Sequence, residues 1–249
     1  MKSIKDLKIA CVIPARLKST RFPEKVLKNL NGKPILSWVW DAANNCEVFE
    51  EIIFAVDDER TAKLIDSFGG KWVMTSPECP SGTMRLVEFR NKTEKKFDLW
   101  LNWQADEPLI PQDMIFDLLK GVDLKNDVYT LKKRISNLEA LKTNYVKVVD
   151  DKDGKALYFS RAPIPFIREH NEEYNPYYKH VGLYLYHDEA IKKISLLQPS
   201  ELENIEKLEQ LTFLYNGLKI RVLETIHEGK GIDFEQDLKD AENYLINRR

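Results

Sequence analysis

The stretch that decides the fold of this chain is residues 9–25, IACVIPARLKSTRFPEK. Its apolar half, Ile9–Ile13, predicts a buried strand that ends at Pro14. The loop after this strand contains four cations and two hydroxyl groups: Arg16, Lys18, Arg21, Lys25, Ser19 and Thr20. Such a loop suits a polyphosphate, and the carboxyl end of a strand is where open α/β sheets bind ligands. A solvated basic loop is the alternative that this stretch alone leaves open.

The composition is that of a globular chain without an excess of positive charge. A length of 249 residues fits one large domain, or one domain with a sub-domain. Hydrophobic residues make up 43% of the chain, which is enough for a real core. The formal net charge of -2 lacks the basic excess of general nucleic-acid binders, so we expect no nucleic-acid partner.

The cysteines and the N-terminal sequence indicate a cytoplasmic protein. Cys11, Cys46 and Cys79 are far apart and show no zinc spacing, so we expect reduced thiols. The first residues, MKSIKDLK, contain no apolar signal core. No apolar run approaches the length that spans a membrane, so we expect no membrane insertion.

Strand and helix patterns alternate in the first half of the chain. The predicted strands are Ile9–Ile13, Glu51–Val56, Lys71–Met74 and Leu99–Trp103. The predicted helices run from Pro34 to about Ala43 and over Glu59–Phe68, Gly82–Lys92 and Pro111–Leu119. This alternation predicts an α/β fold with a mostly parallel sheet and helices on both faces.

The second half has a different pattern. Its predicted strands are Asp127–Lys133, Val146–Asp150, Ala156–Ser160 and Lys179–Tyr186, followed by a late strand at Ile220–Leu223. Residues 151–154, Asp-Lys-Asp-Gly, predict a hairpin turn. We therefore expect residues 1–249 to form a single domain with a small antiparallel sub-domain inserted at about residues 127–190. A helix is predicted over Asn204–Leu214, and a terminal helix from Glu235 onward.

Two aspartates are candidates for holding a divalent cation. Asp106 follows an apolar strand, and Asp233 lies in a glycine-containing segment, Gly229-Lys230-Gly231-Ile232-Asp233. Magnesium in proteins is typically held by one or two carboxylates together with phosphate oxygens of the substrate. The alternatives are a turn with capping acids at Asp106 and the N-cap of the last helix at Asp233.

Further polar residues are weaker candidates when taken singly. Ser81-Gly82-Thr83, ahead of Arg85, could bind a ligand through backbone amides at a helix N-terminus. Arg161, at the end of a predicted strand, could clamp a carboxylate. His180, Tyr184, Glu209 and Gln210 have ordinary structural alternatives, either in a strand or on the wet face of a helix. The sequence contains no Walker loop, no GxGxxG fingerprint and no zinc-helix spacing of its histidines.

Together the motifs resemble one family over nearly the whole chain. They are, in order, Pro14-Ala15-Arg16, Ser19-Thr20-Arg21, Pro23 and Lys25, Asn31-Gly32-Lys33-Pro34, Thr75-Ser76-Pro77, Ser81-Gly82-Thr83, Arg85-Leu86, Gln104 with Asp106-Glu107-Pro108-Leu109-Ile110, Val146-Lys147-Val148-Val149, Ala156-Leu157-Tyr158-Phe159-Ser160-Arg161-Ala162-Pro163-Ile164-Pro165, His180-Val181-Gly182 with Tyr184, Leu208-Glu209-Gln210-Leu211, and Gly231-Ile232-Asp233 with Asp237-Leu238. The chain thus resembles the 3-deoxy-manno-octulosonate cytidylyltransferases, also called CMP-Kdo synthetases.

The resemblance implies an activity, a fold and an assembly. CTP and the acid sugar Kdo would give CMP-Kdo and diphosphate, for lipopolysaccharide or capsule biosynthesis. The implied fold is a Rossmann-like nucleotidyltransferase fold, in which the antiparallel sub-domain also makes a homodimer. The implied cofactor is Mg²⁺.

The resemblance also assigns roles to residues. The implied catalytic group is Arg16, Arg21, Lys25, Asp106 and Asp233, with Asp106 and Asp233 as the metal ligands. The implied nucleotide-binding residues are Pro14, Ala15, Arg16, Ser19, Arg21, Lys25, Ser81, Gly82 and Arg85. The implied sugar-binding residues are Gln104, Arg161, His180, Tyr184, Glu209 and Gln210.

Three segments depart from the family pattern. The family usually has glycine at Ala105, an acidic residue at Met84, and Pro-Gly-Lys-Pro where this chain has Pro23-Glu24-Lys25-Val26. The departures leave other acceptors open, such as 8-amino-Kdo or a sialic-acid-like sugar. A non-catalytic nucleotide-binding protein on the same fold is the alternative from another class.

Overall fold

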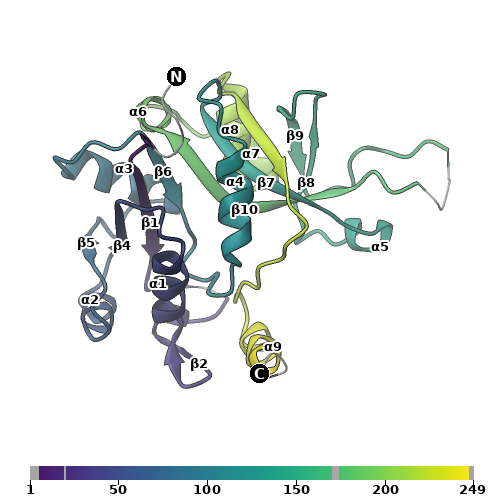
Figure 1. Cartoon of the computed structure of the whole chain (residues 1–249). Coiled ribbons are helices and arrows are strands. Elements are labelled where there is room, and N and C mark those ends of the chain that lie inside the picture. Colours follow the sequence, from purple (N-terminus) through teal and green to yellow (C-terminus); the bar gives the residue numbers. More distant parts are fainter. Residues whose placement is uncertain (1–5, 20, 170–173, 247–249) are drawn as a thin grey trace. The chain divides into compact units, whose positions relative to one another are not determined.

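The computed structural model describes residues 6–19, 21–169 and 174–246 (Figure 1). Thr20, part of the predicted phosphate-binding loop, lies outside these residues. The chain divides into two compact units, which are described separately. The first unit is Met1–Ile115 with Glu228–Arg249, and the second is Phe116–His227, which contains the segment 127–190 predicted as a sub-domain. Within the described ranges, no helix combines the length and the apolar character needed to cross a bilayer.

The first unit is built on a parallel sheet with β1 (Ile9–Ala15) in its interior. β1 pairs in parallel with β4 (Glu51–Val56) on one side and with β6 (Leu99–Asn102) on the other, and β4 pairs in parallel with β5 (Trp72–Met74). Every residue of β1 is buried, as expected for a strand covered on both faces. The chain adds strands first on one side of β1 and then on the other. This reversal makes the carboxyl end of β1 the place where a ligand crevice forms.

Helices follow these strands, and polar side chains cap the starts of two of them. The helices are α1 (Ile35–Asn45), α2 (Glu59–Asp66), α3 (Gly82–Lys92) and α4 (Gln112–Lys120). The Asp58 carboxylate accepts from the backbone N–H of Arg60 at the start of α2, and the Ser81 hydroxyl accepts from that of Met84 at the start of α3. Such caps satisfy N–H groups that the first turn of a helix leaves unpaired.

A small apolar cluster joins the loop after β1 to the C-terminal segment. Next to this loop lie the short helix η2 (Lys25–Leu27) and the antiparallel pair of β2 (Asn29–Leu30) and β3 (Lys33–Pro34). The buried residues of the cluster are Phe22, Leu30, Ile35, Ile232 and Ala241, of which Ala241 lies on α9 (Glu235–Ile246). Residues far apart in sequence are thereby held together in the first unit, beside the candidate metal ligands.

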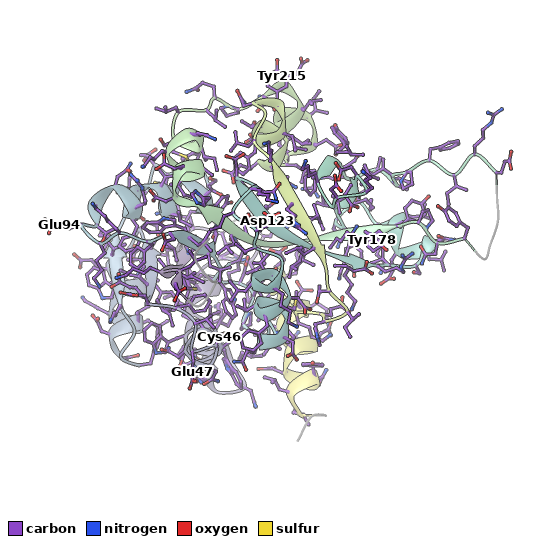
Figure 2. The ribbon with its side chains drawn as sticks, turned by 45° about the horizontal axis from the view of Figure 1, so that its top comes forward. Cys46, Glu47, Glu94, Asp123, Tyr178 and Tyr215 are labelled. Carbon is purple, nitrogen blue, oxygen red and sulfur yellow. The ribbon has the colours of Figure 1, made fainter. Side chains whose placement is uncertain are left out.

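The second unit is mostly antiparallel. Its strands are β7 (Val128–Arg134), β8 (Lys147–Asp150), β9 (Ala156–Ser160), β10 (Tyr178–His187) and β11 (Ile220–Glu224). β10 is antiparallel to β7 and β8, β8 is antiparallel to β9, and β11 is parallel to β7. Asp123, labelled in Figure 2, ties two of these strands, because its carboxylate accepts from Tyr129 on β7 and from Arg221 on β11.

The predicted fold class is confirmed in both halves. The first unit has the parallel sheet and helices, and the second has the antiparallel strands, including the hairpin turn, where Gly154 has φ 76. Four elements were not predicted: the β2–β3 pair, η2, α5 (Asn137–Ala140) and α6 (Asp188–Ile194). Pro34 precedes α1 as its N-cap residue and is not its first helical residue.

The continuous helix predicted over Asn204–Leu214 is wrong. The segment forms α7 (Glu201–Glu206) and α8 (Gln210–Tyr215), separated by Lys207, which has φ 55. The side chain of Arg161 supplies the physical reason, because it donates to the backbone carbonyls of Glu206 and Lys207. A continuous helix would use these carbonyls for its own hydrogen bonds. Ile205, an apolar residue of α7, is 69% exposed.

Replacing Lys207 by glycine should stabilise the protein. A left-handed backbone is costly for residues with a Cβ and not for glycine, so we expect Lys207→Gly to raise the free energy of unfolding by about 0.5–1 kcal/mol. Lys63→Gly, in the exposed interior of α2, is the matched control and should lower it by about 1 kcal/mol. Urea denaturation measures both changes. A lower stability of Lys207→Gly would contradict the helix break.

Candidate active site

A pocket in the first unit opens at the carboxyl end of β1. It brings together the loop after β1, the start of α3 and the residues that follow β6. Ten of the residues predicted for the site line it: Pro14, Arg16, Ser19, Arg21, Lys25, Ser81, Gly82, Arg85, Gln104 and Asp106. Ala15, also predicted, is fully buried within β1. The predicted phosphate loop and the predicted metal ligand Asp106 therefore belong to one cavity.

Lys25 is the centre of the charged groups in this pocket. Its ammonium group donates to the carboxylates of Asp106 at 2.5 Å and Asp233 at 3.1 Å, and to the carbonyl of Ile232 at 3.2 Å. The Lys25 side chain is only 12% exposed. Arg21 contacts the same carboxylate oxygen of Asp233 as Lys25 does, with its Nη2 3.0 Å from Oδ1. Two cations thus balance two carboxylates, of which Asp106 lines the pocket and Asp233 is joined to it through Lys25.

The backbone at the C-terminal segment fixes where Asp233 points. The N–H of Ile232 donates to the carbonyl of Asp106 at 2.7 Å, which joins the two candidate metal ligands through the main chain. At the start of α9, the Asp237 carboxylate accepts from the backbone N–H groups of Asp233 and Phe234. Since Asp237 serves the helix start, the carboxylate of Asp233 is directed to Lys25 and Arg21. Its alternative role as the capping group of this helix is not what the structure shows.

The donor set suits magnesium. Asp106 and Asp233 converge on a single cationic group, and a pair of carboxylates completed by substrate phosphate oxygens is a typical magnesium environment. Among the described residues, no group of three or more His, Cys, Asp or Glu side chains could hold a metal ion. A metal at this place would therefore need oxygen ligands from the substrate.

A buried ion pair holds the first residues of the phosphate loop. The Asp57 carboxylate, directly after β4, accepts from the backbone N–H of Leu17 at 2.9 Å and from Arg85 at 2.8 Å. Arg85 also donates to the Thr75 hydroxyl at 2.7 Å. The side chains of Arg85 and Asp57 are 1% and 6% exposed. Arg85, predicted to bind the nucleotide, lines the pocket and at the same time anchors the loop.

The start of α3 approaches β1 closely. A Cβ at Gly82 would lie 3.3 Å from Pro14 and 3.5 Å from the side-chain oxygen of Gln104, so a larger residue there would crowd the pocket wall. The first N–H groups of a helix are unpaired by the helix itself and attract anionic or polar ligands. Gly82, the first residue of α3, is therefore in a position to present its backbone amide to a ligand in this pocket, and Ser81 lines the pocket next to it.

Sequence reasoning missed some of the lining residues. Cys79 and Pro80 line the pocket, as does Lys18, which was noted as a loop cation but not assigned to the site. The Cys79 thiol donates to Glu88 at 3.0 Å, and burial together with this carboxylate raises its pKa to about 11, so it is a neutral thiol. Asp57 was missed as well, although a carboxylate that ends a parallel strand is the same signal that drew attention to Asp106.

The three departures from the family pattern have distinct positions. Ala105 is 4% exposed, and it lines the pocket between Gln104 and Asp106. Met84 is half-buried in the first turn of α3. Glu24 has φ 53, and its carboxylate points to Arg60, with Oε1 2.8 Å from Nη1. The acid among the loop cations is therefore paired by a residue of α2.

Four predicted sugar-binding residues lie in the second unit: His180 and Tyr184 on β10, and Glu209 and Gln210 at the start of α8 (Gln210–Tyr215). His180 Nε2 is 2.9 Å from the Thr130 hydroxyl, and its ring contacts that of Tyr184, with centroids 5.2 Å apart. The strand is irregular between Val181 and Tyr184, which re-aims its side chains. Burial lowers the pKa of His180 to about 3, so its ring is neutral at neutral pH.

Glu209 lies near Tyr184. Burial is the main cause that raises the pKa of Tyr184, and electrostatic interaction with Tyr186 and Glu209 adds to it. Gln210, the first residue of α8, follows Glu209 in the chain and is buried.

Arg161 has a structural use that was not predicted. Its guanidinium donates to the carbonyls of Glu206, Thr143 and Lys207, at 2.8, 3.2 and 3.5 Å. Its own carbonyl accepts from the buried ammonium of Lys147 at 2.5 Å. Arg161 thus fixes the end of α7, directly before Glu209. Its expected contact with a sugar carboxylate stays a prediction.

Comparisons with known proteins identify the class and then the family. The model of the cytidylyltransferase family matches residues 10–220. A 3-deoxy-manno-octulosonate cytidylyltransferase of Thermodesulfovibrio yellowstonii is 44% identical over 247 residues, which cover 94% of this chain and 97% of the relative. One of Geobacter sulfurreducens is 40% identical, covering 94% of this chain and 97% of that protein. This chain belongs to the 3-deoxy-manno-octulosonate cytidylyltransferase family of nucleotidyltransferases.

Solved structures agree with this family and with the predicted fold. A CMP:2-keto-3-deoxy-manno-octonic acid synthetase complexed with CTP matches with a TM-score of 0.92 and 38% identity, covering 97% of this chain and 100% of that one. A 4-diphosphocytidyl-2C-methyl-D-erythritol synthase of Anaerococcus prevotii, at 14% identity, matches in fold alone with a TM-score of 0.64. The predicted nucleotidyltransferase fold and the predicted family are both confirmed.

Removing one partner of the buried ion pair should destabilise the first unit. In Asp57→Asn the Arg85 guanidinium keeps its charge without a carboxylate, so we expect the free energy of unfolding to fall by about 3 kcal/mol. Asp41→Asn breaks an ion pair with Lys33 whose two side chains are much more exposed, and it should cost less than about 1 kcal/mol. Urea denaturation compares the two variants. An equal loss of unfolding free energy in the two variants would show that the buried pair contributes no more to stability than the exposed one.

Proposed function

We propose that this chain transfers CMP from CTP to 3-deoxy-manno-octulosonate and releases diphosphate. The observation that carries the proposal is the pocket at the end of β1, where loop cations lie beside the Lys25–Asp106–Asp233 group. Family membership supports the reaction, since relatives with 38% or more identity carry this activity in their names. The nucleotide is proposed to be CTP, with which the related synthetase was solved.

The loop cations are proposed to bind the triphosphate. Arg16, Lys18 and Arg21 line the pocket together with the Ser19 hydroxyl, and Lys25 lies at its inner end. The Arg16 Nε donates to the Lys18 carbonyl at 3.1 Å, which orders the loop while leaving other N–H groups of the guanidinium for phosphate oxygens. Fixed cations stabilise charge that develops on a leaving diphosphate, because they need no reorganisation during the reaction.

The cytosine and ribose are proposed to lie at the start of α3. Gly82 offers its backbone amide there, and Pro14 with Gln104 form the adjoining wall. Arg85 is proposed to support the pocket wall and not to bind the nucleotide directly, because its guanidinium already donates to Asp57 and Thr75. This arrangement would place the α-phosphate between the helix start and Asp106.

Asp106 and Asp233 are the residues that would hold magnesium. When bound, the ion would polarise the α-phosphate and lower the pKa of an attacking hydroxyl. Lys25 and Arg21 balance these two carboxylates, so that the pocket presents no uncompensated negative charge to an incoming triphosphate. The anomeric oxygen bonds to the α-phosphorus while the bond from phosphorus to the diphosphate oxygen breaks, and the proton of the hydroxyl passes to water or to the released diphosphate.

Recognition of the acid sugar is proposed for Tyr184, His180, Glu209 and Gln210 of the second unit. Gln104 of the first unit lines the pocket at the end of β1. The neutral His180 ring is hydrogen-bonded to Thr130 through Nε2, and its other ring nitrogen can form one hydrogen bond with a sugar hydroxyl. Glu209 accepts from hydroxyl groups, and the Gln210 amide can both donate and accept. Arg161 is proposed to contribute by fixing the α7–α8 junction, in addition to any contact with the sugar carboxylate.

The reaction is tested by diphosphate release from CTP in the presence of magnesium. We expect release with Kdo, and little with UTP or ATP in place of CTP. The same assay with 8-amino-Kdo and a sialic acid tests the alternative acceptors. Release with one of these sugars and none with Kdo would correct the acceptor, and no release with any acid sugar would refute the proposal.

Loss of either proposed metal ligand should lower turnover strongly. We expect Asp106→Asn and Asp233→Asn to reduce kcat by about 100-fold or more, because the metal contributes several kcal/mol of transition-state stabilisation. Asp113→Asn, an exposed acid in the first turn of α4, is the matched control and should keep normal turnover. Diphosphate release at saturating CTP and Kdo measures kcat. Near-normal turnover of either site variant would remove that residue from the proposed metal site.

A homodimer is proposed to form through the second unit. Large apolar side chains are strongly exposed on α5, on β9 and between β9 and β10: Leu138, Leu141, Leu157, Phe166 and Tyr174. Several exposed apolar side chains of one compact unit are typical of a surface that a partner covers. The partner proposed is a second copy of this chain.

Charges on this surface should separate the subunits. We expect the double variant Leu138→Glu/Phe166→Glu to be monomeric at a concentration at which the unchanged protein is dimeric, because each glutamate would be buried unpaired in the interface. Leu196→Glu, at an equally exposed position after α6, is the control and should remain dimeric. Light scattering coupled to gel filtration gives the mass. A monomeric wild-type protein would contradict the proposed dimer.

A further inference from the structure

Glu24 is an unusual residue for the position it occupies. In sequence it lies between two of the loop cations, Arg21 and Lys25. Its φ is 53, a backbone conformation that favours glycine. Its carbonyl accepts from the N–H of Leu27 at 2.9 Å, so the conformation is part of the turn that leads into η2. A negative charge is thus fixed by the backbone beside the pocket proposed for the triphosphate.

The side chain of Glu24 pairs with Arg60, which is in turn hydrogen-bonded to Asp58. Oε1 of Glu24 is 2.8 Å from Nη1 of Arg60. Asp58 accepts from Arg60 twice, from the backbone N–H at 2.8 Å and from Nε at 3.2 Å. Arg60 therefore uses one side of its guanidinium on its own helix start and presents the other to Glu24.

Two consecutive acids after β4 thereby anchor both ends of the phosphate loop. Asp57 binds the beginning of the loop directly, through the N–H of Leu17. Asp58 binds its end indirectly, through Arg60 and Glu24. A second pocket lies behind the loop, and it is lined by Arg16 and Lys18 together with Glu24 and Arg60. Since Arg16 and Lys18 border both pockets, the charge of Glu24 acts on the same cations that face the triphosphate.

We infer that Arg60 is a positioning residue for the phosphate loop, which neutralises Glu24 and keeps its carboxylate turned away from the bound diphosphate moiety. The inference rests on the proposed CTP site and concerns how that site tolerates an acid. Without Arg60, the carboxylate can turn toward the neighbouring cations and repel the phosphates. Both side chains are about half-exposed, so screening limits the effect to about 2–5-fold in affinity.

The test is a double-mutant cycle read by binding. The dissociation constants of inorganic pyrophosphate and of CTP are measured by calorimetry in wild-type protein, Arg60→Ala, Glu24→Gly and the double variant. We expect Arg60→Ala to weaken both ligands about 2–5-fold, and Glu24→Gly to bind within about twofold of wild type or more tightly. In the Glu24→Gly background, Arg60→Ala should have no further effect, because the charge that it neutralises is gone.

Matched variants separate positioning from loss of charge or of structure. Lys63→Ala removes a positive charge from the same helix at an exposed position, and should leave both dissociation constants unchanged. Glu24→Gln removes the charge without changing the backbone, and should also abolish the effect of Arg60→Ala. Arg60→Gln is measured as a second removal of the cation, with unfolding curves for every variant. In turnover assays Arg60→Ala should raise the KM for CTP and leave kcat unchanged.

The outcomes decide between the inference and its alternatives. Equal weakening by Arg60→Ala in both backgrounds would show that Arg60 contacts the anion itself, and would overturn the inference. Unchanged dissociation constants in the folded Arg60 variants would overturn it as well. If pyrophosphate binding changes across the four variants as expected but the protein shows no turnover, the inference about Arg60 is supported and the proposed function is refuted. If wild-type protein binds neither ligand, both fail.

Discussion

The site depends on the ammonium group of Lys25 and its three oxygen partners. Asp106 comes from the end of β6, Asp233 and Ile232 come from the segment before α9, and Lys25 comes from the loop after β1. No other contact of this pocket joins all three segments through a single group among the residues that the structure describes. The apolar cluster around Phe22 and Ile232, against which Leu109 packs, contains residues of the same three segments. Apolar packing and charge pairing therefore both hold these segments together. Cations that balance the carboxylates make a pocket that an anion can enter.

The other end of the site is organised by the strand beside β1. Two consecutive acids after β4 hold the loop that follows β1: Asp57 through the backbone N–H of Leu17, and Asp58 through Arg60 and Glu24. Asp57 is itself held by a buried ion pair with Arg85. The buried pair is rigid, whereas the exposed pair is open to salt and solvent. A parallel sheet delivers such residues to one edge, since the carboxyl ends of its strands lie together. The fold thereby explains why so few polar residues suffice to define the pocket.

Much of this arrangement could be predicted from the sequence, and the failures have physical reasons. β4 and α3 have the predicted bounds, Glu51–Val56 and Gly82–Lys92. β1 extends past the predicted end at Ile13, because Pro14 and Ala15 still pair with β4. The helix break at Lys207 could not be predicted, because it depends on Arg161, which is distant in sequence. For the same reason, neither the pairing of Glu24 with Arg60 nor the structural use of Arg85 was visible. Residues of the pocket could be named from motifs, but their partners required the fold.

A crystal structure of the chain with CTP and Mn²⁺ in place of Mg²⁺ would test the central claim most directly, through the anomalous signal of manganese. The account predicts one manganese peak within coordination distance of both Asp106 and Asp233, together with phosphate oxygens, and Lys25 moved from between the carboxylates to the phosphates. A manganese peak at other residues would contradict it. So would bound CTP with Lys25 still bridging Asp106 and Asp233 and no metal beside them.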